Sequence, residues 1–82
     1  MNIHQARKLA ETSGWGVTLW DPRSDYWSMS FEKPDKAAIF VRFSPTGILT
    51  KVDATDFVTG IHRAPTRYKG DRLSHYLTEG IN

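Results

Sequence analysis

The sequence predicts a small α+β domain with an N-terminal helix, a four-stranded antiparallel meander and a short C-terminal helix, both helices covering one face of the sheet. Three observations support this. Apolar residues recur at helical spacing near the N-terminus, the period then changes to two, and short turn-forming segments separate the alternating stretches. A chain of 82 residues suffices for one domain, so we expect residues 1–82 to form a single unit.

The first helix is expected over residues 3–13. Asn2 can cap its N-terminus, and Gly14 stands where a left-handed residue commonly ends a helix. The apolar stripe of this helix consists of Ile3, Ala6, Leu9 and Ala10. Such a narrow stripe predicts a helix that packs one side against a sheet.

Four alternating segments follow, at residues 15–20, 26–31, 38–43 and 48–52. The segments between them contain turn formers, notably Pro34, Pro45 and Gly47. Loops this short connect only antiparallel neighbours, which predicts a meander.

Symmetric loops would set the register of this sheet. Val17 would then face Met29, Met29 would face Ile39, and Phe43 would lie beside Ile48. These residues share one face, which is almost wholly apolar and must be the core side. The face is expected to carry Trp15, Val17, Leu19, Trp27, Met29, Phe31, Ile39, Val41, Phe43, Ile48, Thr50 and Val52.

The last third of the chain is less regular. Residues 53–58 are expected to form a short helical turn capped by Asp53, and residues 61–70 a loop. A last helix is expected to begin after Asp71 and to end at Gly80. Its buried face would consist of Leu73, Tyr76 and Leu77.

Composition excludes several classes of protein. The chain has no Cys, so neither a disulfide nor a thiolate metal site can stabilise it. No apolar run approaches the roughly 20 residues of a membrane span, and the polar N-terminus is unlike a signal peptide. We therefore expect a cytoplasmic protein that does not act at a membrane.

Catalytic and metal-binding motifs are also missing. His4, His62 and His75 do not form a zinc pattern, and the chain contains no glycine-rich phosphate loop and no G-x-S-x-G sequence. Asp53 and Asp56 could pair as acid and base, but capping a short helix is the commoner use of such residues. The sequence thus predicts a non-enzymatic domain without metal or cofactor.

The face opposite the core is the first candidate for function. It is expected to carry Thr18, Trp20, Tyr26, Ser28, Ser30, Phe40, Arg42, Leu49 and Lys51. Exposed aromatic rings beside cations can stack unpaired bases and neutralise phosphates. Alternatively, the C-terminal segment or a second copy of the chain covers this face, since apolar patches commonly mark packing or association.

The basic C-terminal segment is the second candidate. Residues 1–41 carry five basic and five acidic residues, so the whole net charge of +2 lies in residues 42–82. The basic C-terminal segment is the stretch 62–75, and its Lys and Arg residues are Arg63, Arg67, Lys69 and Arg72. They could contact phosphates, or they could form an ordinary solvated surface.

Two functional hypotheses result. In the first, the chain is a small binding or regulatory domain that engages nucleic acid: Trp20, Tyr26 and Phe40 stack, while Arg42, Lys51 and the four C-terminal cations meet phosphates. In the second, the same aromatic face is a protein interface, as in a homodimer, an adaptor or an inhibitor.

Overall fold

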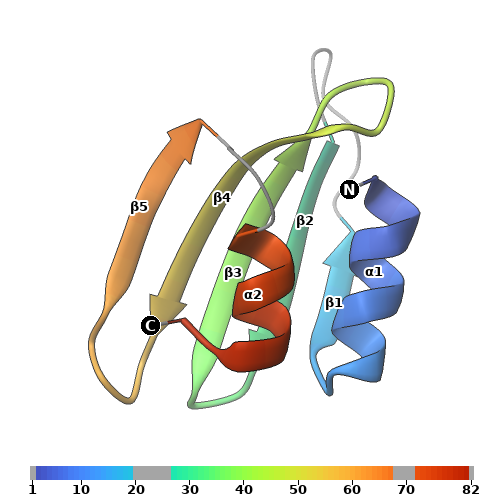
Figure 1. Ribbon diagram of the computed structural model, residues 1–82. Helices are drawn as coiled ribbons and strands as arrows, with labels where there is room; N and C mark the ends of the chain where they lie inside the picture. Colours follow the sequence, from blue (N-terminus) through green and yellow to red (C-terminus); the bar gives the residue numbers. More distant parts are fainter. Residues whose placement is uncertain (1, 20–26, 68–71, 82) are drawn as a thin grey trace.

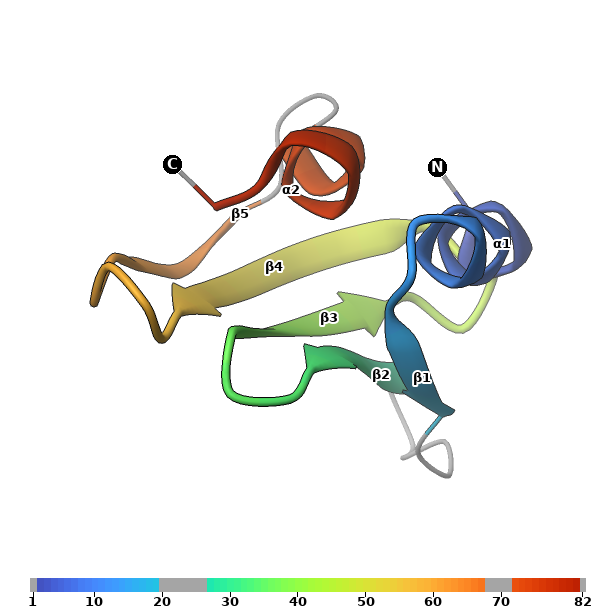
Figure 2. The ribbon, with the colours of Figure 1, turned by 90° about the horizontal axis from the view of Figure 1, so that it is seen from below.

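The computed structural model describes residues 2–19, 27–67 and 72–81, which form a compact α+β fold with two helices and a five-stranded antiparallel sheet (Figure 1). The elements are α1 (Ile3–Thr12), β1 (Gly16–Leu19), β2 (Trp27–Lys33), β3 (Ala37–Phe43), β4 (Leu49–Asp56), β5 (His62–Arg67) and α2 (Arg72–Glu79). The strands lie side by side in chain order, so the sheet is a meander. Both helices lie on one side of it (Figure 2). Neither described helix is long and apolar enough to cross a membrane.

Helix α1 begins with the predicted cap. The Gln5 backbone N–H donates to Asn2 Oδ1 at 2.9 Å, and the Asn2 backbone N–H donates to Gln5 Oε1 at 2.9 Å. This reciprocal pair satisfies two amide groups that the first helical turn leaves without partners. Ala6 and Ala10 are fully buried, and their small side chains allow the helix to approach the sheet closely.

The core lies between the sheet and the two helices. Its largest fully buried side chains are Phe31, Phe43, Met29, Ile39, Leu73 and Leu77. Trp15 connects the layers: its Nε1 donates to the Leu77 carbonyl oxygen at 2.9 Å, and Lys33 Nζ lies 4.6 Å from the centre of its ring. Helix α2 buries the three predicted residues and is followed by Gly80, whose φ is +106°.

The register of the first two strand pairs is displaced by two residues from the prediction. Val17 lies opposite Phe31 instead of Met29, and Met29 lies opposite Val41. Strand β2 continues to Lys33, so the β2–β3 turn is tighter than predicted and the pairing moves with it. A shift of two preserves sidedness, because side chains alternate with period two. The predicted core face of β2 and β3 is therefore the observed one, whereas Leu19 on β1, also predicted in the core, is 45% exposed.

The predicted sidedness of Ile48 and Leu49 is wrong. The register of the β3–β4 pair shifts between Arg42 and Phe43, which places Phe43 opposite Leu49. Leu49 is 5% exposed and belongs to the core, whereas Ile48 is 63% exposed. Thr50 also faces solvent, and its hydroxyl donates to the Arg42 carbonyl oxygen at 3.0 Å. An irregular register of this kind adds one residue to a strand and so reverses the sides on which its neighbours lie. A prediction that assumes unbroken alternation therefore places Ile48 and Leu49 on the wrong sides.

The helical turn predicted at residues 53–58 is also wrong, because β4 runs through Asp53. The carboxylate that makes a turn belongs to Asp56, whose Oδ1 accepts from the backbone N–H groups of Val58 at 2.8 Å and Thr59 at 3.1 Å. Gly60 closes this turn with a φ of +78°, which favours glycine.

The fifth strand replaces most of the loop predicted at residues 61–70. Strand β5 pairs with β4 and forms one edge of the sheet. It contains Pro65, which has no backbone N–H to donate. An edge strand tolerates such a residue because only one of its two sides pairs with another strand. Asp71, after which the last helix is expected to begin, lies outside the described residues.

Candidate functional site

The side of the sheet away from the helices is covered by none of the described elements (Figure 2). We call it the open face. Register pairs arrange its residues in rows across the strands. The phenylalanine row contains Thr18, Ser30, Phe40 and Asp53, and the cation row contains Ser28, Arg42 and Lys51.

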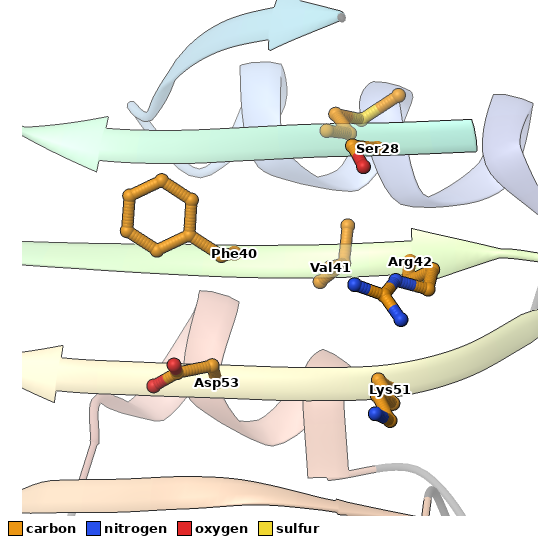
Figure 3. Close-up of a pocket in the computed structure, with 7 residues that line it drawn as sticks. Ser28, Phe40, Val41, Arg42, Lys51 and Asp53 are labelled. Atoms are coloured by element: carbon orange, nitrogen blue, oxygen red, sulfur yellow. The ribbon is translucent and has the colours of Figure 1, made fainter. Parts of the chain in front are cut away.

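A shallow hollow of about 230 Å³ lies where the two rows adjoin. It is lined by Ser28, Met29, Phe40, Val41, Arg42, Lys51 and Asp53 (Figure 3). The figure shows Phe40 and Asp53 at one end of the hollow and the charged groups of Arg42 and Lys51 at the other. The hollow thus combines a flat apolar surface with a positive end.

Phe40 presents an aromatic face to solvent. The residue is 52% exposed, and Figure 3 shows the ring face-on, leaning from β3 toward β2. Its register partner on β2 is Ser30, which is fully buried although it lies on the open face. The ring of Phe40 leans toward the strand that carries this serine. Among the described residues, none forms a hydrogen bond with Ser30 Oγ.

The cation row concentrates positive charge at one end of the hollow. Arg42 and Lys51 are directly opposed on neighbouring strands, where Cβ atoms lie about 4.5–5.5 Å apart. Lys51 is exposed and Arg42 is half-buried. The Ser28 hydroxyl, on the other side of Arg42, adds a polar group that can donate or accept. An anionic group would be attracted to this end.

Asp53 forms a short hydrogen bond across the edge of the sheet. Its Oδ1 lies 2.7 Å from His62 Nε2, and the side chains are 33% and 50% exposed, respectively. An ionised carboxylate only accepts hydrogen bonds, so Nε2 carries the proton in this pair. The sequence interpretation missed this contact because it placed Asp53 in a helical turn and His62 in a loop.

The structure unites only some of the predicted site residues. Phe40, Arg42 and Lys51 share the open face, and Ser28 lies opposite Arg42. Phe40, however, lies opposite Asp53, not beside Lys51 as predicted, because the β3–β4 register differs from the symmetric one. Trp20, Tyr26 and Lys69 lie outside the described residues.

Among the basic C-terminal residues whose side chains are described, Arg63 and Arg72 lie away from the open face. Arg63 lies opposite Ala54, a core-side residue, and is exposed. Arg72 begins α2, which packs on the other side of the sheet. The backbone of Arg67 pairs with that of Lys51, at the end of the cation row.

No trio of His, Asp or Glu side chains within the described ranges is arranged to hold a metal ion. Comparison with known proteins adds no assignment. No family model, no curated protein and no solved structure matches this chain.

Proposed function

We propose that this domain is a non-enzymatic binding module that engages single-stranded nucleic acid through the open face. Phe40 stacks a base, and the cation row contacts the backbone phosphates. The observation that supports this most directly is the ring of Phe40, which lies flat and half exposed beside two directly opposed cations.

Each part of the hollow suits one part of a nucleotide. Base–aromatic stacking tolerates any base, because every base has a π-face. Phe40 and Arg42 are two residues apart on β3, a separation of about 7 Å. A base on the ring therefore places its own sugar-phosphate near Arg42 and Lys51. The small hydroxyl side chains of the open face leave room for a planar ring.

The first experiment measures binding of a labelled, mixed-sequence oligonucleotide of about ten nucleotides, a length suited to a small site. Fluorescence anisotropy is recorded between roughly 50 and 200 mM salt. Two phosphate contacts on a single strand predict that log K falls against log salt with a slope of about −1.4, and Lys51→Ala should reduce that slope by about 0.7. Lys8→Ala is the matched control, because Lys8 is an exposed cation on α1, away from the open face.

The stacking contact has its own matched pair of variants. Phe40→Ala should weaken binding by roughly 5- to 160-fold, the equivalent of about 1–3 kcal/mol per stacked base. Phe57→Ala should leave it unchanged, because Phe57 is 57% exposed but lies in the β4–β5 turn. An oligonucleotide affinity that changes neither with salt concentration nor in the Phe40→Ala variant would refute the proposal.

A second candidate is an isologous homodimer through the same face. The observation that favours it is the charge layout of the hollow, with cations at one end and Asp53 at the other. In a twofold arrangement the positive end of one copy can meet the negative end of the other, with Phe40 near the centre. Light scattering tests this: a dimer mass that Phe40→Ala reduces to that of a monomer would support it, and a monomer mass for the parent protein would exclude it.

A further inference from the structure

Asp53 lies beside the ring that is proposed to stack a base. Asp53 and Phe40 are register partners on β4 and β3, so their Cβ atoms are about 4.5–5.5 Å apart. Both side chains line the same hollow, at the end away from the cations (Figure 3). An edge of a base stacked on Phe40 therefore comes within reach of the Asp53 carboxylate.

The Asp53 carboxylate has a hydrogen-bond partner on the neighbouring strand. His62 Nε2 donates to its Oδ1 at 2.7 Å, which restrains the side chain. A carboxylate has about four acceptor sites, so the bond from His62 leaves capacity for further donors. With a side chain only 33% exposed, Asp53 is partly removed from competing water. A restrained and partly shielded group that only accepts hydrogen bonds will discriminate between donors and acceptors on a base edge.

The four bases differ at the Watson–Crick edge in a way that matters for such a group. Guanine presents two adjacent donors, N1–H and N2–H, which match the two oxygens of a carboxylate. Adenine and cytosine each present a donor next to an unprotonated ring nitrogen, which the carboxylate would repel. Uracil presents one donor between two carbonyl oxygens. Guanine is thus the base that offers a carboxylate two hydrogen bonds without an opposing acceptor.

We propose that Asp53 reads the Watson–Crick edge of the base stacked on Phe40 and selects guanine, with His62 as the residue that positions the carboxylate. This inference rests on the proposed nucleic-acid function and adds a base preference to it. It also orients the strand, because the base edge meets Asp53 while the phosphate of the same nucleotide meets the cation row.

The test uses oligonucleotides of about seven nucleotides that are all uridine except for one central base. The central base is guanine, adenine, cytosine, uracil or hypoxanthine, and affinity is measured by competition against one labelled strand. Hypoxanthine matches guanine but lacks the N2 amino group, so it removes one of the two donors. The unmodified protein should prefer guanine over adenine by roughly 5- to 160-fold, as a good bidentate pair does, with hypoxanthine between them.

The variants assign this preference to one side chain. Asp53→Asn should abolish the preference for guanine over hypoxanthine while binding to the all-uridine strand persists, since the amide presents a donor to the edge in place of an acceptor. Glu32→Gln is the matched control: it removes one exposed carboxylate from the same face, in the row beyond Phe40, and should keep the preference. His62→Ala should reduce the guanine-to-hypoxanthine ratio without changing all-uridine affinity.

Three results would overturn the inference, and they are distinguishable. If all five strands bind equally and with the predicted salt dependence, the open face binds nucleic acid but Asp53 selects no base. If no strand binds, the proposed function fails, and the base preference fails with it. A guanine preference that survives Asp53→Asn would assign the selection to another residue. Circular dichroism melting of each variant separates these outcomes from loss of the fold.

Discussion

Ser30 provides a direct test of how the open face is packed. The hydroxyl is fully buried and, within the described part of the chain, has no hydrogen-bond partner. Burying such a group without a partner costs about 1–3 kcal/mol relative to its hydrated state in the unfolded chain. Ser30→Ala removes the group and leaves a void no larger than one oxygen atom. We therefore expect the variant to be more stable by about 1 kcal/mol, which corresponds to a rise of about 4–8 °C in Tm for a domain of this size.

The same reasoning predicts that the gain depends on Phe40. If the ring keeps water from the hydroxyl, Phe40→Ala admits water, and Ser30→Ala should then change stability by only a few tenths of a kcal/mol. Urea unfolding of the four proteins of this cycle, followed by tryptophan fluorescence, gives the coupling energy, expected to be about 1 kcal/mol. An equal effect of Ser30→Ala in both backgrounds would refute the assigned role of the ring. Destabilisation by Ser30→Ala in the parent protein would refute the claim that the hydroxyl has no partner.

Two further predictions concern the fold. Trp15→Phe leaves the buried Leu77 carbonyl oxygen without its 2.9 Å donor, so the free energy of unfolding should fall by about 1–3 kcal/mol, measured by urea unfolding. Gly60→Ala places a side chain at a φ of +78° and should cost about 1–2 kcal/mol, although nothing lies within 4 Å of the added Cβ. Gly16→Ala is its control, because that position has no positive φ and only the Glu32 carbonyl oxygen at 3.6 Å. Equal losses at the two glycines would contradict the conformational explanation.

The elements that could be predicted from the sequence are those specified by local chemistry. Asn2 caps α1 because its side-chain oxygen can accept from the backbone N–H three residues later, and this contact does not depend on the tertiary fold. The sidedness of β2 and β3 follows from alternation alone, and a register error of two residues does not change it. These features depend on residues that are close in the sequence.

The features that sequence reasoning mispredicted depend on contacts between distant segments. Strand β5 pairs with β4, a contact between segments that the local sequence does not specify. Pro65 and the polar composition of this segment argue against a strand when the sequence is considered alone. Asp53 and Asp56 look alike as capping residues, yet only Asp56 lies where the strand ends. The irregular register near Phe43 has no sequence signature, so Leu49 was predicted on the wrong side.

The candidate site shows the same division. Alternation predicts that Phe40, Arg42 and Lys51 share one face of the sheet, and the structure places them there. The contact between Asp53 and His62 requires β5, which the sequence pattern does not predict, so the sequence indicates a helix cap at Asp53 instead. The neighbour of Phe40 likewise depends on the β3–β4 register, which the symmetric-loop assumption could not supply.

A charge exchange within the hollow separates the two candidate functions. In an isologous dimer the Lys51 end of one copy meets the Asp53 end of the other, and both contacts occur twice. Lys51→Asp should then break the dimer, and combining it with Asp53→Lys should restore it, because each altered end meets an altered partner. The phosphates of a nucleic acid, in contrast, stay negative whichever variant of the protein is used. If the open face binds a nucleic acid, all three proteins stay monomeric and Lys51→Asp weakens binding. The double variant does not regain affinity, because a phosphate next to a base on Phe40 still meets the acidic side chain at position 51. Light scattering and anisotropy on the same three proteins decide between these outcomes. A restored dimer would refute the nucleic-acid proposal, and a monomer whose binding falls in both variants would refute the dimer.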